Sequence, residues 1–384
     1  MKRYYFDWAA GAPMAVLGSS QNAPDDPAAF GNPSSRHAEG RAALAALEEA
    51  RSRCASALGV SGDTIYFTSG ATEANAIVLF STLLRRASGI GQAVLTTETE
   101  HPSITRNGPI LERLGVPVRY AGVDPYGTAV PELLAASLRK YADTTMVALM
   151  YVNNETGAVS DLGRLCEAAR ERDGKPLHIH SDMAQAAGKI PFSLGDIDVD
   201  SAVFSAHKIG GPRGIGILYL KKPVEALLRG GGQERGVRAG TENTAGALSF
   251  ADTLCLRTAS AETDYEEAVK KMSLLIRSLR DIKRCTIIPE CRGEADERFS
   301  PYILQAAFKD VPGEVMARAL DDEGFAVSTG SACSAGSKKR PALNAMGIGD
   351  DVAFTSIRIS IGWDTDYGDI DALVDAIRRI LKRL

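Results

Sequence analysis

The stretch Ser205-Ala206-His207-Lys208 decides how the rest of this 384-residue sequence is interpreted. It follows the apolar run Val199-Asp200-Ser201-Ala202-Val203-Phe204 and precedes the glycine-rich segment Gly210-Gly211-Pro212-Arg213-Gly214-Ile215-Gly216. A lysine at the end of a buried strand is unfavourable unless its ammonium group is paired or loses its charge. Lysine loses that charge when it forms an imine with a carbonyl compound. The alternative is a surface lysine just past a strand end, and this stretch alone leaves both interpretations open.

The composition is typical of a large globular protein. Hydrophobic residues make up 45% of the chain, which is enough for a sizeable core, and the length allows roughly two to three domains. The net charge is −4 and the pI is about 5.9, so we expect no direct nucleic-acid partner. No apolar run approaches the ~20 residues of a membrane span, so we expect no membrane association. Residues 1–7 lack the apolar region of a secretory signal.

The six cysteines are spread along the sequence, and none forms a C-x-x-C pair. This spacing argues against a zinc site, an iron–sulfur ligand set and a disulfide framework. We therefore predict no metal site, reduced thiols and a cytoplasmic location.

Apolar, strand-like runs alternate with helix-like stretches up to about residue 255. Examples are the run Thr64-Ile65-Tyr66-Phe67-Thr68 and the run at 145–152, and a helix is predicted before the first of them at 41–58. Strands that are apolar on both faces and alternate with helices indicate a mostly parallel sheet covered on both sides. We predict a large α/β domain over residues 14–254.

The pattern changes beyond about residue 255. A long charged helix is predicted at 261–282, an alternating strand at 356–361 and a final helix at 369–383. We predict a smaller α+β domain that combines residues 1–13 with residues 255–384.

Polar residues at the ends of predicted strands are the candidate site, because ligands of open α/β sheets bind at the carboxyl ends of the strands. The stretch Ser69-Gly70-Ala71-Thr72 lies at a strand-to-helix junction. Backbone N–H groups at a helix start, together with the Thr72 hydroxyl, would bind a phosphate. Ordinary N-capping by Ser69 or Thr72 is the alternative.

His101 also follows a predicted strand, and Asp182 ends a run in which polar and apolar residues alternate. An imidazole at His101 would stack on a flat ring, and a satisfied structural histidine is the alternative. A carboxylate at Asp182 would pair with a pyridinium nitrogen, as pyridoxal phosphate enzymes require, and Gln185 would reach a ring oxygen; helix N-capping is the alternative for Asp182. With Lys208, these residues would form one set: a phosphate cup, a ring stacker, an acid for the ring nitrogen and a lysine.

A series of stretches, in order along nearly the whole chain, resembles the cysteine desulfurase family. These are pyridoxal phosphate enzymes with the fold type I architecture of class V aminotransferases. The matching stretches are Gly31-Asn32-Pro33-Ser34-Ser35, Phe67-Thr68-Ser69-Gly70-Ala71-Thr72-Glu73-Ala74-Asn75, Glu100-His101-Pro102-Ser103, Val152-Asn153-Asn154-Glu155, Asp182-Met183-Ala184-Gln185, Ser205-Ala206-His207-Lys208, Gly231-Gly232-Gln233-Glu234-Arg235-Gly236-Val237-Arg238-Ala239-Gly240-Thr241-Glu242-Asn243 and Gly330-Ser331-Ala332-Cys333. The resemblance implies a large domain with a mostly parallel seven-stranded sheet and a smaller α+β domain that holds the Cys333 loop.

The resemblance also implies a role for each matching site residue. Lys208 would bind pyridoxal 5'-phosphate covalently. Asn154 and Arg358 would bind the substrate, because a guanidinium group pairs with a carboxylate through two hydrogen bonds; a surface strand residue is the alternative for Arg358. Thr241 would reach the cofactor phosphate of another subunit, which implies a homodimer. The implied cofactor-binding residues are Ala71, Thr72, His101, Asn154, Asp182, Gln185, Ser205, His207, Lys208 and Thr241.

Cys333 decides the reaction that the resemblance implies. It lies in a small, polar stretch at 329–341, which is typical of a mobile loop. Two lysines and an arginine follow it and would favour the thiolate. Lys208, Cys333 and His101 would be the catalytic residues in the conversion of L-cysteine to L-alanine and a Cys333 persulfide. An iron–sulfur scaffold protein or a tRNA-thiolation relay would accept the sulfur.

Two alternatives remain at this point. One is a selenocysteine lyase or another fold type I aminotransferase or lyase, and the other is a catalytically idle paralogue that serves as a scaffold. The presence of both Lys208 and Cys333 argues against the scaffold. The family's usual Asp-Asn-Ala-Ala-Thr opening is Asp7-Trp8-Ala9-Ala10-Gly11 here. Trp8 would either reshape the site entrance or a dimer contact, or be a tolerated packing change.

Overall fold

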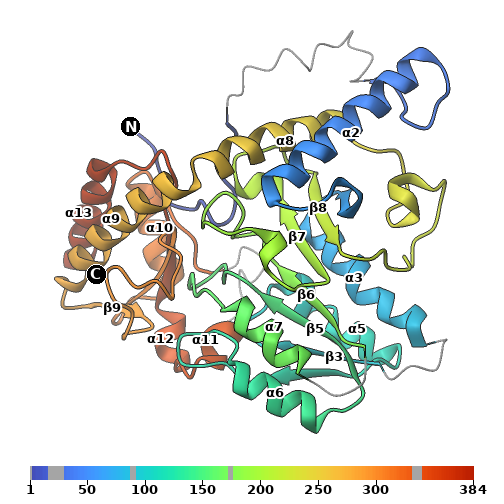
Figure 1. Ribbon diagram of the computed structural model, residues 1–384. Helices are drawn as coiled ribbons and strands as arrows, with labels where there is room; N and C mark the ends of the chain where they lie inside the picture. Colours follow the sequence, from blue (N-terminus) through green and yellow to red (C-terminus); the bar gives the residue numbers. More distant parts are fainter. Residues whose placement is uncertain (1, 16–29, 87–91, 172–175, 331–339) are drawn as a thin grey trace.

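The computed structural model describes residues 2–15, 30–86, 92–171, 176–330 and 340–384. These residues form a larger part, built on a seven-stranded sheet, and a smaller part beside it (Figure 1). The strand order of the large sheet is β2-β8-β7-β6-β5-β3-β4. Its strands are β2 (Ile65–Thr68), β3 (Ala93–Thr97), β4 (Val118–Ala121), β5 (Thr144–Met150), β6 (His178–Asp182), β7 (Ser201–Ser205) and β8 (Gly216–Leu220).

Strand β8 runs antiparallel to its two neighbours, β2 and β7, whereas the other pairings in this sheet are parallel. The sequence prediction missed this strand. A short apolar run after a glycine-rich segment does not distinguish a strand from a loop, and β8 is recognisable as a strand through its pairing on both sides.

Helices cover both faces of the sheet, as predicted. Strand β5 is buried along its whole length. Its residues Val147 and Leu149 pack in the core on one face, while Met146 and Ala148 pack in the core on the other. The first face is covered by α2 (Ala38–Leu58), α6 (Pro131–Lys140), α7 (Leu162–Arg170) and α8 (Thr244–Ala259). The second is covered by α3 (Ala71–Arg86), α4 (Pro102–Thr105) and α5 (Gly108–Arg113). In Figure 1, α2 and α8 lie side by side.

The smaller part has its own hydrophobic core around a three-stranded antiparallel sheet. Phe6 and Ala9 from the N-terminal segment pack within this core. The elements here are β1 (Tyr4–Tyr5), α9 (Ala261–Arg280), β9 (Cys285–Ile288), β10 (Ile303–Phe308), α10 (Gly313–Asp322), β11 (Phe325–Ala326), α11 (Pro341–Ala345), α12 (Asp350–Phe354), β12 (Ser356–Ser360) and α13 (Tyr367–Arg383). The domain boundary at residue 254 stays a prediction, and helix α8 runs continuously through that position.

Short 3-10 turns complete the described elements, and the one that contains Lys208 directly follows β7. These turns are η2 (Gly62–Thr64), η3 (Leu194–Asp196), η4 (Ala206–Lys208) and η5 (Gln233–Gly236). Among the described helices, none combines the length and apolar content that a bilayer span requires.

Trp8 is a packing residue in this structure. Its side chain is 4% exposed, and its Nε1 donates to the Tyr5 carbonyl oxygen at 3.0 Å. The indole also packs edge-on against Trp363, with ring centroids 4.8 Å apart. A side chain at Gly362 would collide with it, because a Cβ there would lie 2.2 Å from Trp8 atoms.

Candidate active site

The register of three strands brings the predicted strand ends to one edge of the sheet. Gly216, at the start of β8, pairs with Thr68 on one side and with Ser205 on the other. Asp182, at the end of β6, pairs with Val203 in β7. The carboxyl ends of β2, β6 and β7 therefore lie together, and the residues that follow them face a common space.

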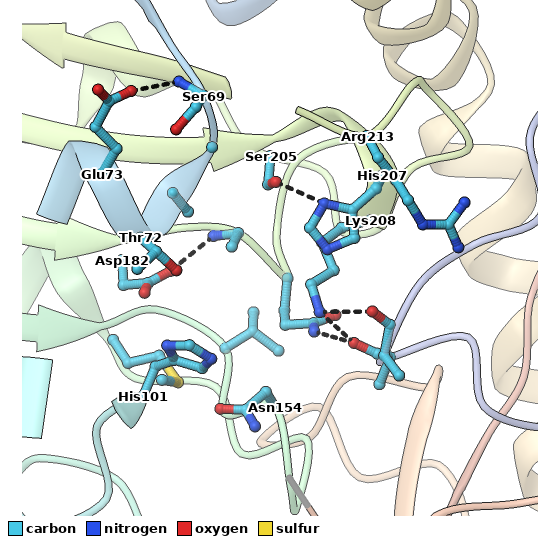
Figure 2. A pocket seen from close by; sticks show the side chains of 18 of the residues that line it. Ser69, Thr72, Glu73, His101, Asn154, Asp182, Ser205, His207, Lys208 and Arg213 are labelled. Carbon is cyan, nitrogen blue, oxygen red and sulfur yellow. Dashed lines mark hydrogen bonds between the residues drawn. The ribbon is translucent and has the colours of Figure 1, made fainter. Parts of the chain in front are cut away.

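That space is a cavity of about 500 Å³ (Figure 2). Ten of the residues predicted from the sequence line it: Ala71, Thr72, His101, Asn154, Asp182, Gln185, Ser205, His207, Lys208 and Arg358. Two predicted residues are not in this set. Thr241 is not among the residues that line the cavity, and Cys333 lies outside the described residues.

One end of the cavity is formed by the start of helix α3. Gly70 precedes the helix at φ +149°, a conformation that residues with a side chain rarely adopt. Gly216 lies close to Gly70, because a Cβ on Gly216 would be 2.5 Å from Gly70 Cα. Ser205 Oγ lies 2.8 Å from His207 Nδ1. Burial and the neighbouring Lys208 lower the pKa of His207 to about 4, so its imidazole is neutral at pH 7. This end offers backbone N–H groups and hydroxyls to an anion.

Asp182 lines the same cavity, and both of its carboxylate oxygens accept hydrogen bonds. Asn75 Nδ2 donates to Oδ2 at 2.9 Å, and the Ala184 backbone N–H donates to Oδ1 at 3.0 Å. The carboxylate is 4% exposed. Asn75 belongs to helix α3, and sequence reasoning assigned it no role because its contact with Asp182 crosses 107 residues.

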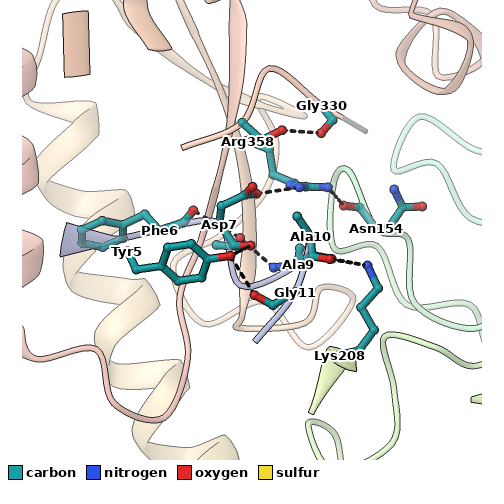
Figure 3. Close-up of polar contacts among 12 residues, drawn as sticks. Tyr5, Phe6, Asp7, Ala9, Ala10, Gly11, Asn154, Lys208, Gly330 and Arg358 are labelled. Atoms are coloured by element: carbon teal, nitrogen blue, oxygen red, sulfur yellow. Dashed lines mark hydrogen bonds and ion pairs between the residues drawn. The ribbon is translucent and has the colours of Figure 1, made fainter. Parts of the chain in front are cut away.

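Lys208 points toward the N-terminal segment (Figure 3). Its Nζ donates to the carbonyl oxygens of Ala9 and Ala10 at 2.7 and 3.1 Å. The Gln185 Nε2 donates to the same Ala9 oxygen at 2.8 Å. Because Ala9 and Ala10 also line the cavity, the first residues of the chain form part of the site, and the sequence prediction did not include them.

A second lysine lies behind Gln185. Lys189 is 2% exposed, and its Nζ donates to Gln185 Oε1 at 2.7 Å. Burial, followed by the positive charges of Lys208 and Arg358, lowers the pKa of Lys189 to about 7. This contact fixes the side-chain amide of Gln185, with its oxygen toward Lys189 and its nitrogen toward Ala9.

Arg358 on β12 enters the cavity from the smaller part of the molecule (Figure 3). Its Nη2 lies 2.8 Å from Asp7 Oδ1, and its Nη1 donates to the Asn154 carbonyl oxygen at 2.8 Å. The side chain is buried, and its Nε has no partner among the described residues. The surface alternative for Arg358 is therefore wrong. Asp7 was visible in the sequence as part of the N-terminal motif, but nothing local identified it as the partner of Arg358.

His101 caps the short helix α4. Its Nδ1 accepts from the Ser103 backbone N–H at 3.1 Å and lies 2.8 Å from Ser103 Oγ. Burial lowers the pKa of His101, and the positive charge of Lys208 acts in the same direction. The imidazole is therefore neutral at pH 7.

The donors and acceptors of the cavity fit pyridoxal phosphate. The α3 start with Thr72 and Ser205 suits a phosphate group. A buried carboxylate at Asp182 suits a protonated ring nitrogen, and the Lys208 amine lies in the same cavity.

Comparison with known sequences places the whole chain in one family. The aminotransferase class-V family model matches residues 4–373. A cysteine desulfurase IscS of Dictyoglomus turgidum is 34% identical over 100% of this chain and 96% of its own length. A cysteine desulfurase IscS of Vibrio cholerae is 36% identical over 92% of this chain and 86% of its own.

Solved structures agree with this assignment. A NifS-like protein superposes with a TM-score of 0.90 at 32% identity, with 100% of both chains covered. SspA in complex with cysteine superposes with a TM-score of 0.76 at 27% identity, over 94% of this chain and 99% of that one. The chain therefore belongs to the cysteine desulfurase family of pyridoxal phosphate-dependent class-V aminotransferases.

Proposed function

We propose that this protein is a cysteine desulfurase that converts L-cysteine to L-alanine and transfers the substrate sulfur to Cys333. The observation that supports this most is the meeting of Lys208, Asp182 and Arg358 in one cavity. Asp182 and Arg358 belong to two separate sheets, and Lys208 lies in the turn that follows β7; together they supply a buried carboxylate, a carboxylate-binding guanidinium group and an amine. The names of the full-length relatives support the choice of L-cysteine as substrate.

The cavity residues divide the binding of pyridoxal phosphate among them. Ala71, Thr72, Ser205 and His207 hold the phosphate group at the start of α3. Asp182 pairs with the ring nitrogen, and the hydrogen bonds that both of its oxygens accept hold the carboxylate in place. When bound, the cofactor withdraws electrons from the Cα of an amino acid substrate.

Three further residues complete the cofactor site. Gln185 binds the ring hydroxyl, and His101 stacks on the ring. Thr241 binds the phosphate of the second subunit in a homodimer, which agrees with its position outside the cavity of its own chain.

Arg358 binds the substrate carboxylate. Its contacts with Asp7 and the Asn154 carbonyl use one hydrogen on each terminal nitrogen, so further N–H groups, including the unpartnered Nε, are available to a carboxylate. The two existing contacts hold the guanidinium plane before the substrate arrives, which lowers the entropy lost on binding. The Asn154 side chain lies beside the substrate in this arrangement.

Lys208 moves the proton of the substrate Cα. Its hydrogen bonds to the Ala9 and Ala10 carbonyl oxygens hold the Nζ at the cavity wall. An amine held in this way accepts a proton from a carbon whose acidity the site has raised. His101 then assists the transfer of the proton of the substrate thiol.

The sulfur transfer conserves atoms and electrons. The Cys333 thiolate attacks the substrate sulfur, an S–S bond forms and the C–S bond breaks. The electron pair of the broken bond stays with the substrate carbon, which takes up a proton to give L-alanine. Cys333 is left as a persulfide and passes the outer sulfur to an acceptor protein, for which an iron–sulfur scaffold or a tRNA-thiolation relay is our proposal. We place the enzyme in the cytoplasm.

Incubation with L-cysteine tests this proposal. We expect stoichiometric L-alanine and sulfide in the presence of a thiol reductant, and one additional sulfur atom on Cys333 by mass spectrometry. Cys333→Ala should keep the absorbance of the bound cofactor and lose sulfide release. Unchanged sulfide release in that variant would contradict the persulfide step, and alanine formation from selenocysteine but not from cysteine would favour a selenocysteine lyase.

A further inference from the structure

A chain of hydrogen bonds runs through the interior behind the cavity, and Asn75 lies at its centre. Asn75 is fully buried one turn into helix α3. Its Nδ2 donates to Asp182 Oδ2 at 2.9 Å and to Ser103 Oγ at 2.8 Å. Its Oδ1 lies 2.8 Å from His180 Nε2. The side-chain amide therefore has a partner for both of its amide hydrogens and for its oxygen.

The orientation of the Asn75 amide follows from Asp182. An ionised carboxylate accepts hydrogen bonds and donates none, so the Asn75 nitrogen has to face Asp182 and its oxygen has to face His180. His180 must then donate from Nε2, which leaves its Nδ1 as an acceptor for Ser201 Oγ at 2.8 Å. His180 is neutral at pH 7, because burial, together with His178, lowers its pKa to about 3.

Ser103 links Asn75 to His101. Ser103 Oγ accepts a hydrogen bond from Asn75, and its own hydrogen is directed to His101 Nδ1, which lies 2.8 Å away. The Ser103 backbone N–H also points at that nitrogen. With two donors directed at Nδ1, the single proton of the neutral imidazole belongs on Nε2.

We propose that Asn75 is a positioning residue that connects Asp182 to His101 and, through Ser103, fixes His101 in the tautomer with its proton on Nε2. The charge of Asp182 orients the side-chain hydrogen bonds of the chain, and together with the Ser103 backbone N–H they determine which nitrogen of His101 exchanges protons with the substrate. This inference rests on the proposed function for the role of His101. The hydrogen-bond chain itself does not depend on the reaction.

Three charged groups act on His101. Asp182 favours the imidazolium form, whereas Lys208 and Arg106 disfavour it. Removing the hydrogen bond that Ser103 Oγ donates to Nδ1 takes a stabilising contact from the neutral form. The midpoint of the His101 titration should therefore rise in Ser103→Ala while these three charges stay in place.

The direct test is the tautomer of His101 in the holoenzyme, measured by NMR of the imidazole nitrogens. The protein has five histidines, so comparison with His101→Gln assigns the signal. We expect the wild type to show the Nε2–H tautomer. In Asn75→Leu and in Ser103→Ala, the chemical shift of His101 Nδ1 should move and the midpoint of the His101 titration should rise. Ser103→Thr keeps the hydroxyl, so its His101 shift and midpoint should match those of the wild type.

Kinetics provide the second measurement. We expect Asn75→Leu to lower kcat by up to about 10²-fold, the effect of misplacing a catalytic group, with a smaller change in KM. Ser81→Ala is the matched control, because Ser81 is a buried residue of the same helix whose hydroxyl bonds to the Val78 carbonyl oxygen. Ser103→Ala is the milder variant in case Asn75→Leu does not fold.

Two results would overturn the proposal: a wild-type His101 with its proton on Nδ1, or a His101 signal and pH profile in Ser103→Ala that match those of Ser81→Ala. Failure of the proposed function looks different. In that case the wild type forms no alanine from L-cysteine, while the His101 tautomer still responds to Ser103→Ala.

Discussion

The two sides of the cavity are built in different ways. The Asp182 side lies within one sheet and the helices on one of its faces, and its single carboxylate is held by neutral donors. The Arg358 side is an ion pair between residues 351 positions apart, with a second contact across 204 positions. Strand register therefore fixes the first side, whereas packing of the smaller part against the larger part fixes the second. Variants on the Asp182 side should act on kcat and cofactor binding, and variants on the Arg358 side should act on KM.

The largest effect is expected at Lys208, which donates hydrogen bonds to the N-terminal segment at Ala9 and Ala10. Lys208→Ala should reduce alanine formation by at least about 10³-fold, because the covalent link to the cofactor and the Cα base are lost together. Its cofactor absorbance should resemble that of free pyridoxal phosphate. Lys221→Ala, at an exposed lysine paired with Asp198, is the control and should behave as the wild type. A covalently bound cofactor in Lys208→Ala would contradict the assignment.

Asp182→Asn tests the Asp182 side alone. One position of the carboxylate becomes an NH₂ group, which faces either the Asn75 amide or the Ala184 N–H, both donors. We expect kcat to fall by about 10²-fold, because the charge that meets the ring nitrogen is removed, while KM changes less. Steady-state kinetics with L-cysteine separate the two constants. A change mainly in KM in Asp182→Asn would contradict the assignment of kcat effects to the Asp182 side.

Arg358→Lys tests the other side. Lysine keeps the charge but not the planar fork, so it cannot hold Asp7, the Asn154 carbonyl and a substrate carboxylate at once. We expect KM for L-cysteine to rise about 10-fold in Arg358→Lys and about 10²-fold in Arg358→Ala, the range for hydrogen bonds to charged groups. Arg318→Lys, at an exposed arginine of α10, is the matched control. If both Arg358 variants instead lost kcat while their KM stayed unchanged, Arg358 would act in a step after substrate binding.

The smallest effect concerns the stability of the folded protein and comes from Glu100, a buried carboxyl group. Burial raises the pKa of Glu100 from 4.5 to about 8, and the charge of Asp182 acts in the same direction. Between these values the folded protein retains a proton that the unfolded chain releases. Stability therefore falls as the pH rises through this window, by at most about 1.4 kcal/mol for each pH unit.

Glu100→Gln removes this titration and still accepts a hydrogen bond from Thr97 Oγ1. Its Tm should equal that of the wild type below pH 4.5 and exceed it above pH 8, as measured by thermal unfolding followed by circular dichroism. A constant difference in Tm across this range would show that Glu100 does not titrate between the two values.

Much of the Asp182 side was predictable from the sequence, because local patterns indicate where strands end. Lys208 and His101 each follow a strand, Asp182 is the last residue of one, and the α3 start at Ala71 follows another. The carboxyl ends of parallel strands share one edge of a sheet, so these residues were expected to meet. All of them line the cavity.

The tertiary structure decided the partners of these residues. Asn75, Lys189 and Asp7 show no local signal of a role, because each acts through a contact that depends on how segments pack. Strand β8 is likewise recognisable by its two neighbours rather than by its own sequence. Periodicity and helix-start signals report the backbone within a few residues. The sequence by itself therefore determined which side chains at the strand ends face the cavity, whereas the packing of distant segments added the N-terminal residues and determined which neighbours hold each side chain and in which direction its hydrogen bonds run.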